Sequence, residues 1–233
     1  MGEAKASGMT GRDAMLSRIR RSLDVTGTES ARREAVGARL AAAPKGVIAP
    51  ESKLDRAARV GLFTEKAEAV KASVSRVANP AQVPAAVAEF LRRNNLPAAI
   101  RHGDDKRLAN LPWRTTPQLA IATGKAAPDD RVGLSHAEAG VAESGSLMLA
   151  SGPANPTTLN FLPENHIVVL AAGDIVPDYE SGWERVRSRY PGPLLPRAVN
   201  FITGPSRSAD IEQTIQFGAH GPRRLHIILV ESA

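Results

Sequence analysis

From about residue 97 onward, short unbroken apolar runs alternate with segments of helical character, and this alternation constrains the fold more than any other feature. Strands that are apolar throughout are typical of parallel sheets whose two faces are covered by helices. Helices are expected over residues 180–190 and 209–217, and the strand candidates are residues 98–101, 118–123, 146–150, 166–171, 199–203 and 225–230. The pattern therefore predicts an α/β domain with a largely parallel central sheet.

The part of the chain before residue 97 is rich in Ala, Arg and Glu and predicts helices. Apolar residues recur at four-residue spacing within residues 13–23, as in an amphipathic helix, at Met15, Ile19 and Leu23. Residues 24–60 contain Gly, Pro and scattered charge, and their apolar periodicity is weak. We therefore expect residues 1–60 to form a helical or flexible extension.

Two further helices are expected between this extension and the alternating region. One covers residues 62–77, and the other covers residues 82–94, where Pro80 and Pro84 punctuate the start. Together with the alternating region, these helices predict one α/β domain over residues 61–233.

The composition excludes several classes of protein. The chain has 233 residues, of which 42% are apolar, so one domain with a sizeable core is expected. It contains no apolar run of about 18 residues and no apolar signal segment near its start, so we expect a cytoplasmic protein without a membrane span. The absence of cysteine excludes disulfides, thiolate metal sites and iron–sulfur ligation by this chain.

The formal net charge of +6 raises the question of nucleic-acid binding. Many of the basic residues lie within residues 12–76 among acidic ones, which is typical of a solvated helical face. With five Phe, two Tyr and two Trp, the chain supplies few stacking platforms for single strands, and no zinc-finger spacing occurs. We therefore expect no specific binding of nucleic acid.

A turn of small and polar residues separates the strand candidate 199–203 from the helix expected over 209–217. Free N–H groups and the helix dipole favour an anion at a helix start, and a guanidinium in the turn adds a full positive charge. In open α/β sheets, ligands bind at the carboxyl ends of strands. The turn therefore predicts a carboxylate or phosphate site formed by Thr203, Gly204, Ser206, Arg207, Ser208 and Asp210.

The same turn has a purely structural interpretation. Ser208 can be the N-cap of the expected helix, and Asp210 then lies in the first turn, where an acidic residue is favourable. The sequence leaves both interpretations open.

A second polar turn lies before the strand candidate 146–150. Its small residues Ser144 and Gly145 let a ligand approach the backbone, and Glu143 can act as a general base or orient a polar substrate. Glu143 can equally be the solvated side chain of a tight loop. The serine is not in a G-x-S-x-G arrangement, so no nucleophile elbow is predicted.

The chain has five histidines, and none of their spacings matches a zinc-binding helix, so the sequence predicts no metal site. His226 lies within an apolar strand candidate and is expected to be a core residue. His220 lies in a loop rich in Gly and Pro, where side chains face a cleft or water, so it joins the candidate binding residues.

Four segments resemble, in the same order, the motifs of the LUD domain family, and within it those of the lactate utilization protein C group. They are residues 142–147 (AESGSL), 162–167 (LPENHI), 201–212 (FITGPSRSADIE) and 218–222 (GAHGP), and the resemblance covers roughly residues 60–230. The family often has Thr where this chain has Ser144, Ser146 and Ser208, so the hydroxyl groups are kept.

The resemblance implies a three-layer α/β sandwich related to the sugar-phosphate isomerase and CoA-transferase superfamily. It also implies a role in the oxidation of L-lactate to pyruvate, alongside two iron–sulfur proteins. Because this chain has no cysteine, the clusters are expected on those partner proteins, and no cofactor is expected on the chain itself.

Two other functions remain open. In one, the chain is a stand-alone enzyme of the isomerase or CoA-transferase type, which acts on a sugar phosphate or an acyl-CoA with Glu143 as base or nucleophile. In the other, it is a non-catalytic assembly factor whose N-terminal helix docks a partner.

Overall fold

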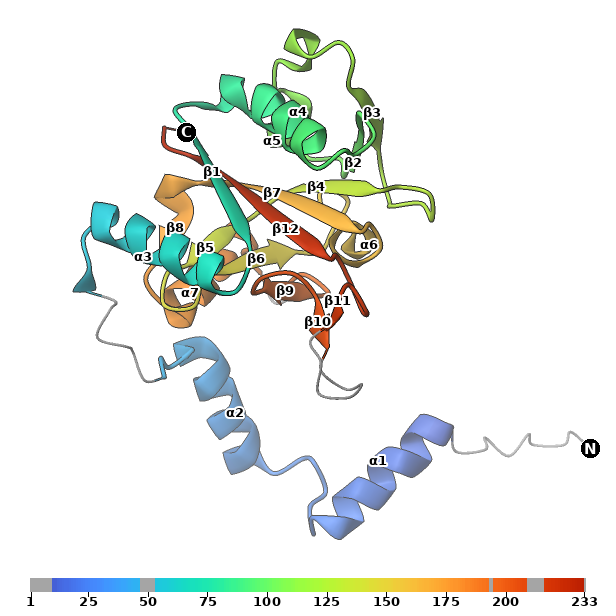
Figure 1. Ribbon diagram of the computed structural model, residues 1–233. Coiled ribbons are helices and arrows are strands. Elements are labelled where there is room, and N and C mark those ends of the chain that lie inside the picture. The colour runs from blue at the N-terminus through green and yellow to red at the C-terminus, as the bar shows by residue number, and fades with distance from the viewer. Residues whose placement is uncertain (1–9, 47–52, 193–194, 209–215, 233) are drawn as a thin grey trace, which may run out of the picture. The chain divides into compact units, whose positions relative to one another are not determined.

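A computed structural model describes residues 10–46, 53–192, 195–208 and 216–232 (Figure 1). The contacts within the chain divide it into two units, Met1–Gly46 and Val47–Ala233. The domain boundary expected at residue 60 stays a prediction.

The first unit contains the helices α1 (Gly11–Ser22) and α2 (Ser30–Ala42). Thr10 caps α1, because its hydroxyl oxygen accepts a hydrogen bond from the backbone N–H of Asp13 at 3.2 Å. The helix predicted over residues 13–23 is confirmed, and its apolar stripe is exposed, with Met15 at 66% and Leu23 at 60%. Neither helix contains a buried residue, so the described part of this unit has no core.

The second unit alternates helices and strands, as the sequence predicts. Its helices are α3 (Arg56–Ala69), η2 (Pro80–Gln82), α4 (Val83–Arg93), α5 (Lys106–Ala109), η3 (Trp113–Thr115), α6 (Thr157–Phe161), η4 (Ala172–Asp174) and α7 (Tyr179–Arg189). Its strands are β1 (Ser73–Val77), β2 (Ala99–His102), β3 (Ala120–Thr123), β4 (Val132–His136), β5 (Ala139–Val141), β6 (Ser146–Ala150), β7 (Asn165–Ala171), β8 (Ile175–Val176), β9 (Val199–Ile202), β10 (Arg207–Ser208), β11 (Gln216–Phe217) and β12 (Arg224–Val230). Within the described ranges, no helix combines the length and apolar character needed to cross a membrane.

Six strands form one sheet in the order β1-β12-β7-β4-β2-β3, and every neighbouring pair is parallel. The neighbouring interior strands β12 and β7 are almost wholly buried, which explains their largely apolar sequences. The predicted parallel α/β sheet is therefore confirmed.

A second sheet of four strands has the order β8-β5-β6-β9. The predicted strands 146–150 and 199–203 belong here and pair antiparallel with each other, so placing them in the parallel sheet was wrong. The tight turn between β5 and β6 permits only antiparallel pairing of these two strands, so β6 enters a separate sheet, where β9 joins its other edge. Gly145 supplies the left-handed φ of 68° that this turn requires.

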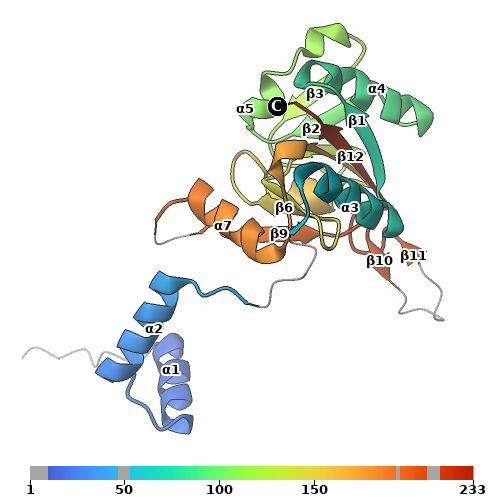
Figure 2. The same cartoon turned by 90° about the vertical axis from the view of Figure 1, so that its left-hand side faces the viewer.

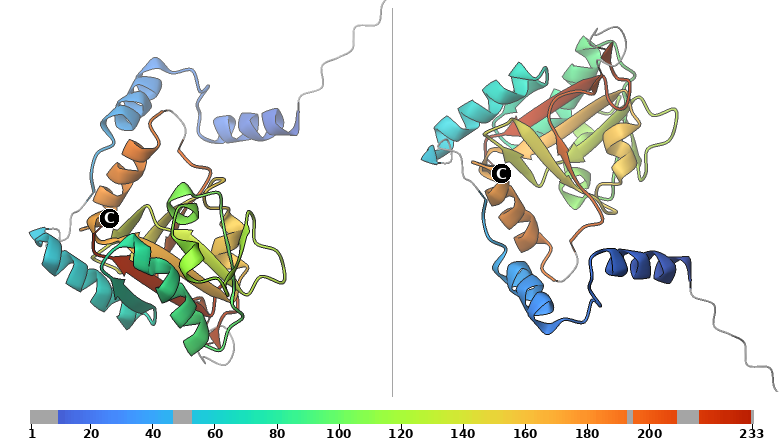
Figure 3. Two further views of the ribbon diagram at one scale, coloured as in Figure 1. Left: turned by 90° about the horizontal axis from the view of Figure 1, so that it is seen from above. Right: turned by 90° about the horizontal axis from the view of Figure 1, so that it is seen from below.

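The parallel sheet separates two cores, because successive side chains of a strand point to opposite faces. Ile227 lies in the core shared with α3 and the four-stranded sheet, whereas Ile228 lies in the core beneath α4. Figure 2 shows the helices α3 and α4 beside the strands of the sheet. Val186 of α7 packs on the other face of the four-stranded sheet. The orange helix α7 and the helix α4 therefore lie on opposite sides of the strands (Figure 3).

Two predicted helices need correction. The helix expected over 62–77 ends early, because α3 stops at Ala69, Lys71 adopts a left-handed φ of 73°, and Ser73–Val77 form a strand. The helix expected over 209–217 is contradicted at its end, where β11 pairs antiparallel with β10. Residues 209–215, and with them Asp210, lie outside the described residues.

Candidate functional site

Three of the four motif segments converge on one pocket, where β7 and β12 begin. The pocket has a volume of about 270 Å³ and is lined by residues from 160–166, 201–207 and 220–225. We call it the motif pocket. Its inner wall includes His166 and Leu225, which lie opposite each other in the parallel register. Segments that are far apart in the chain therefore meet at one place.

His166 is completely buried, and burial lowers the pKa of its imidazole to about 3, so the ring is neutral at physiological pH. Its Nε2 lies 3.0 Å from the hydroxyl of Ser135. That hydroxyl donates its own proton to the Asn155 amide oxygen at 2.9 Å, so it accepts from Nε2–H. The lone pair of His166 is therefore on Nδ1, which has no hydrogen-bond partner among the described residues.

Asn160 stands beside His166 in the wall of the same pocket and is also buried. Its amide oxygen lies 3.4 Å from the Ser135 hydroxyl, whose one proton goes to the nearer Asn155 oxygen, and its Nδ2 has no partner among the described residues. Buried polar atoms are rarely left unpaired in proteins. Two residues of the pocket wall thus carry one unused acceptor, His166 Nδ1, and one unused donor, Asn160 Nδ2.

The two polar turns predicted as binding sites both rest on the C-terminal turn of α3. An added Cβ at Gly145 would lie 2.4 Å from the Ala67 backbone nitrogen. An added Cβ at Gly204, where φ is 77°, would lie 2.4 Å from the Val70 carbonyl oxygen. Glycine is therefore required at both turns. Both turns pack against the C-terminal end of α3.

A cluster of hydroxyls around the buried Ser146 joins the two turns. The Ser146 hydroxyl lies 2.8 Å from that of Ser144, 2.6 Å from that of Thr203 and 3.0 Å from that of Tyr179. The structure therefore brings the predicted residues Ser144 and Thr203 together, with the wholly buried Ser146 between them.

Glu143 lies apart from the motif pocket. Its Oε1 accepts a hydrogen bond of 3.0 Å from the backbone N–H of Tyr179, at the start of α7. Its own backbone N–H donates to the Pro177 carbonyl at 3.1 Å. The carboxylate thus satisfies one of the N–H groups that a helix start leaves without an internal partner.

Ser206, Arg207 and His220 all line the motif pocket, as do Thr203 and Gly204. The Ser206 hydroxyl accepts from the backbone N–H of His220 at 3.3 Å and so holds the His220 loop in place. Arg207 and Ser208 form strand β10, and the helix start expected at residue 209 lies outside the described residues.

The motif pocket is also at the other end of the sheet from the one expected. It lies beside the amino ends of β7 and β12, because the strand that leads into Thr203 belongs to the antiparallel sheet. A different cavity, of about 450 Å³, lies at the carboxyl ends of the parallel strands, beside His136, Ala171 and Val230. No described residue of the motif segments lines that cavity.

The cavity at the carboxyl ends contains paired charges. Arg107 lies 2.7 Å from a carboxylate oxygen of Asp105 and 3.0 Å from one of Glu138. Burial, together with the charge of Arg107, lowers the pKa of His136. Within the described ranges, no group of three or more His, Cys, Asp or Glu side chains is arranged to hold a metal ion.

The prediction from sequence missed His166 and Asn160 as site residues. A signal was present, since His166 is a polar residue at the start of an otherwise apolar strand and follows Pro163 in a loop. Its burial depends on contacts with Ser135, on a strand that the sequence pattern did not reveal.

The LUD domain family model matches residues 60–230 of the chain. Among curated relatives, "Lactate utilization protein C" of Geobacillus sp. (strain WCH70) is 39% identical over 100 residues, which cover 42% of each chain. The protein of the same name from Bacillus subtilis (strain 168) is 36% identical over 107 residues, 46% of this chain and 45% of the relative. The chain thus spans less than half the length of these relatives.

Two further comparisons extend over more of the chain. An uncharacterized protein of Neisseria meningitidis serogroup B is 33% identical over 151 residues, which cover 63% of this chain and 64% of that protein. The crystal structure of a DUF162 family protein from Deinococcus radiodurans has a TM-score of 0.57 at 22% identity and covers 76% of this chain and 99% of that chain. That structure shares the fold.

Proposed function

Because the chain belongs to the LUD domain family, we propose that it serves lactate utilization, as a subunit or accessory factor in the oxidation of L-lactate to pyruvate. The proposed partners are two iron–sulfur proteins, which would carry the redox centres, since this chain has no cysteine. The proposed compartment is the cytoplasm.

The observation that carries the proposal is the convergence of motif segments on one pocket with two buried, unpaired polar atoms. His166 Nδ1 accepts a hydrogen bond, so a ligand must donate to it, and Asn160 Nδ2 donates, so a ligand must accept from it. L-Lactate has a hydroxyl that can donate and oxygens that can accept. Arg207 at the same pocket supplies the charge that a carboxylate or phosphate needs.

Isothermal titration of the full chain with L-lactate, pyruvate and inorganic phosphate tests this proposal. We expect L-lactate to bind more tightly than pyruvate, because pyruvate has no hydroxyl to donate to His166. Replacing His166→Asn should weaken L-lactate binding by about 2–10-fold and leave pyruvate unchanged, since one neutral hydrogen bond is lost. Arg207→Ala should weaken both ligands by about tenfold through loss of a charge-assisted contact, without unfolding the chain.

His226→Gln is the matched control, because His226 is also a buried histidine but both of its ring nitrogens have hydroxyl partners, Ser73 and Ser75. It should leave every affinity unchanged. Equal affinities of wild type, His166→Asn and Arg207→Ala for all three ligands would contradict a ligand site in the motif pocket.

A stand-alone CoA-transferase would form a thioester on Glu143 after incubation with an acyl-CoA. Glu143 is already hydrogen-bonded to the start of α7 and lies outside the motif pocket, which favours the accessory role. Mass spectrometry of the acyl-CoA-treated chain distinguishes the two. An adduct at Glu143 would contradict the accessory role and support a CoA-transferase activity.

The assembly-factor alternative is favoured by the exposed apolar stripes of the first unit, where Leu40 is 77% exposed in addition to Met15 and Leu23. If this alternative holds, deleting residues 1–45 abolishes co-purification with the iron–sulfur partners while L-lactate binding persists. Unchanged co-purification after the deletion would contradict the assembly-factor alternative.

A further inference from the structure

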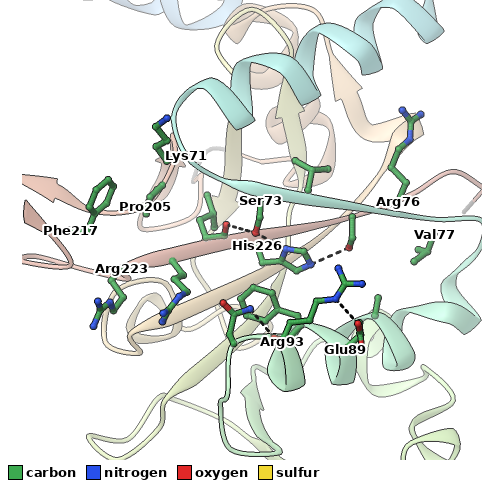
Figure 4. A pocket seen from close by; sticks show the side chains of 17 residues that line it. Lys71, Ser73, Arg76, Val77, Glu89, Arg93, Pro205, Phe217, Arg223 and His226 are labelled. Carbon is green, nitrogen blue, oxygen red and sulfur yellow. Dashed lines mark hydrogen bonds and ion pairs between the residues drawn. The ribbon is translucent and has the colours of Figure 1, made fainter. Parts of the chain in front are cut away.

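A groove of about 790 Å³ runs beside strand β1 and takes no part in the proposed function (Figure 4). Strand β1, helix α4 and the start of β12 form its walls, and we call it the β1 groove. In Figure 4, Lys71 and Arg223 lie toward one end of the groove, whereas Arg76 and Arg93 lie toward the other.

Strand β1 is an edge of the six-stranded sheet, and within the described part of the chain it pairs with β12 alone. The backbone N–H of Glu231 donates to the Val77 carbonyl at 3.0 Å, so the peptide groups of Val77 face β12. Because peptide groups alternate in direction along a strand, those of Val74 and Arg76 face away from the sheet. An edge of this kind is a template for one more strand.

The floor beside this edge is rigid and uncharged. The His226 ring accepts or donates hydrogen bonds at 2.8 Å to Ser73 and 3.1 Å to Ser75, both on β1. The ring also stacks on Phe90 of α4, with centroids 4.4 Å apart. Burial lowers the pKa of His226 to about 4, so the floor carries no charge at physiological pH.

The charge of the groove decides among the possible occupants. Its charged lining consists of Lys71, Arg76, Arg93, Arg223 and Arg224, with Glu89 as the acidic member. Arg93 pairs with Glu89, and Arg76 pairs with Glu231, which lies just outside the lining. A second copy of β1 would bring the same cations and be repelled, whereas an acidic segment would be attracted.

We propose that the β1 groove binds an extended acidic segment of a partner protein, which adds a strand alongside β1. The outward peptide groups of Val74 and Arg76 hydrogen-bond the added backbone, and acidic side chains meet Lys71 and Arg223. A single-stranded nucleic acid fits less well, because it cannot use the strand edge and because Phe90 is already stacked on His226.

Fluorescence anisotropy of the full chain with a labelled peptide of alternating Glu and Val tests the proposal. Saturable binding is expected that weakens with salt, together with loss of binding when alternate Val residues of the peptide are replaced by Pro. Arg223→Glu should weaken binding by about tenfold or more, since attraction becomes repulsion. The matched control is Arg187→Glu, an exposed arginine of α7 outside the groove, which should have no effect.

Val74→Pro removes an outward-facing donor of the edge and should also weaken peptide binding. Thermal melting shows whether this variant is folded. If Val74→Pro is unfolded, Arg223→Glu is the variant that tests the proposal. The proposal is overturned if the peptide fails to bind, or binds equally to wild type and Arg223→Glu. It is also overturned if an oligo(dT) probe binds in place of the peptide, or if sedimentation shows a dimer that Val74→Pro dissociates. L-Lactate affinity is measured in parallel and should not change, which separates this proposal from the proposed function.

Discussion

At the scale of residues, burial sets the charge of three histidines. It lowers the pKa of His166 to about 3 and that of His226 to about 4, from an ordinary value of 6.5. Burial next to Arg107 also lowers the pKa of His136. A core position for His226 could be predicted from its apolar strand, whereas that of His166 depends on how the loop before β7 folds.

These pKa shifts make stability depend on pH. The unfolded chain takes up protons on these histidines near pH 6.5, whereas His226 in the folded chain does so only near pH 4, so acid favours unfolding between these values. The free energy of unfolding should fall by about 1.4 kcal/mol per pH unit for each such histidine. Urea denaturation at a series of pH values measures the slope.

His226→Gln should reduce that slope by the contribution of one histidine. His220→Gln is the control, because His220 is exposed. A slope that is the same in wild type and His226→Gln would contradict the burial of this ring.

Two glycines of the second unit should respond oppositely to alanine. Gly204→Ala should lower the free energy of unfolding by about 1–3 kcal/mol, because φ is 77° and the new Cβ meets the Val70 carbonyl. Gly61→Ala, in the middle of α3 with open space around it, should raise the free energy of unfolding by about 0.5–1 kcal/mol. Urea midpoints of the two variants measure both effects, and a stabilising Gly204→Ala would show that the turn is not held against α3.

At the scale of elements, strong periodicity predicted most helices and strands, but it did not predict which strands pair with each other. Strands β7 and β12 and helices α4 and α7 lie where the sequence pattern puts them. Strand β1 was missed because its short Ser-Val-Ser-Arg-Val sequence continues an apparently helical stretch. A strand pattern does not specify its partner, so β6 and β9 were predicted in the wrong sheet.

The candidate site was predictable to a similar extent. Five of the predicted residues line the motif pocket, because small and polar residues in a turn after a strand are visible in the sequence: Thr203, Gly204, Ser206, Arg207 and His220. Glu143 belongs to a neighbouring turn and binds the start of α7 instead. The hydrogen-bond network of Ser135, Asn155 and Asn160 forms only when α6 packs on β4, so no local sequence pattern predicts it.

The hydroxyl cluster joins three elements, β6, the end of β9 and α7, through Ser146. Ser146→Ala should lower the free energy of unfolding by about 0.5–1.5 kcal/mol, because it removes the hydroxyl that the half-buried Ser144 and Tyr179 share. Ser188→Ala, on an exposed part of α7, is the control and should change it little. Equal urea midpoints for Ser146→Ala and wild type would contradict the cluster as a structural joint.

At the scale of the whole molecule, the core belongs entirely to one of the two units over the residues described. Helices α1 and α2 contain no buried residue, so deleting residues 1–46 should leave the melting temperature of the second unit within a few degrees of the full chain. Differential scanning calorimetry of both forms measures it. A large drop in melting temperature would show that the first unit contributes to the core.

The position of His166 opposite Leu225, in two neighbouring interior strands of the parallel sheet, has a consequence for the detection of a bound ligand. Backbone amides in such strands exchange with deuterium only when the whole domain opens, whereas surface loops exchange through small local fluctuations. A ligand held by His166 would stabilise the closed domain as a unit. Its signature would be slower deuterium uptake along β7 and β12, in the amides that are already the slowest.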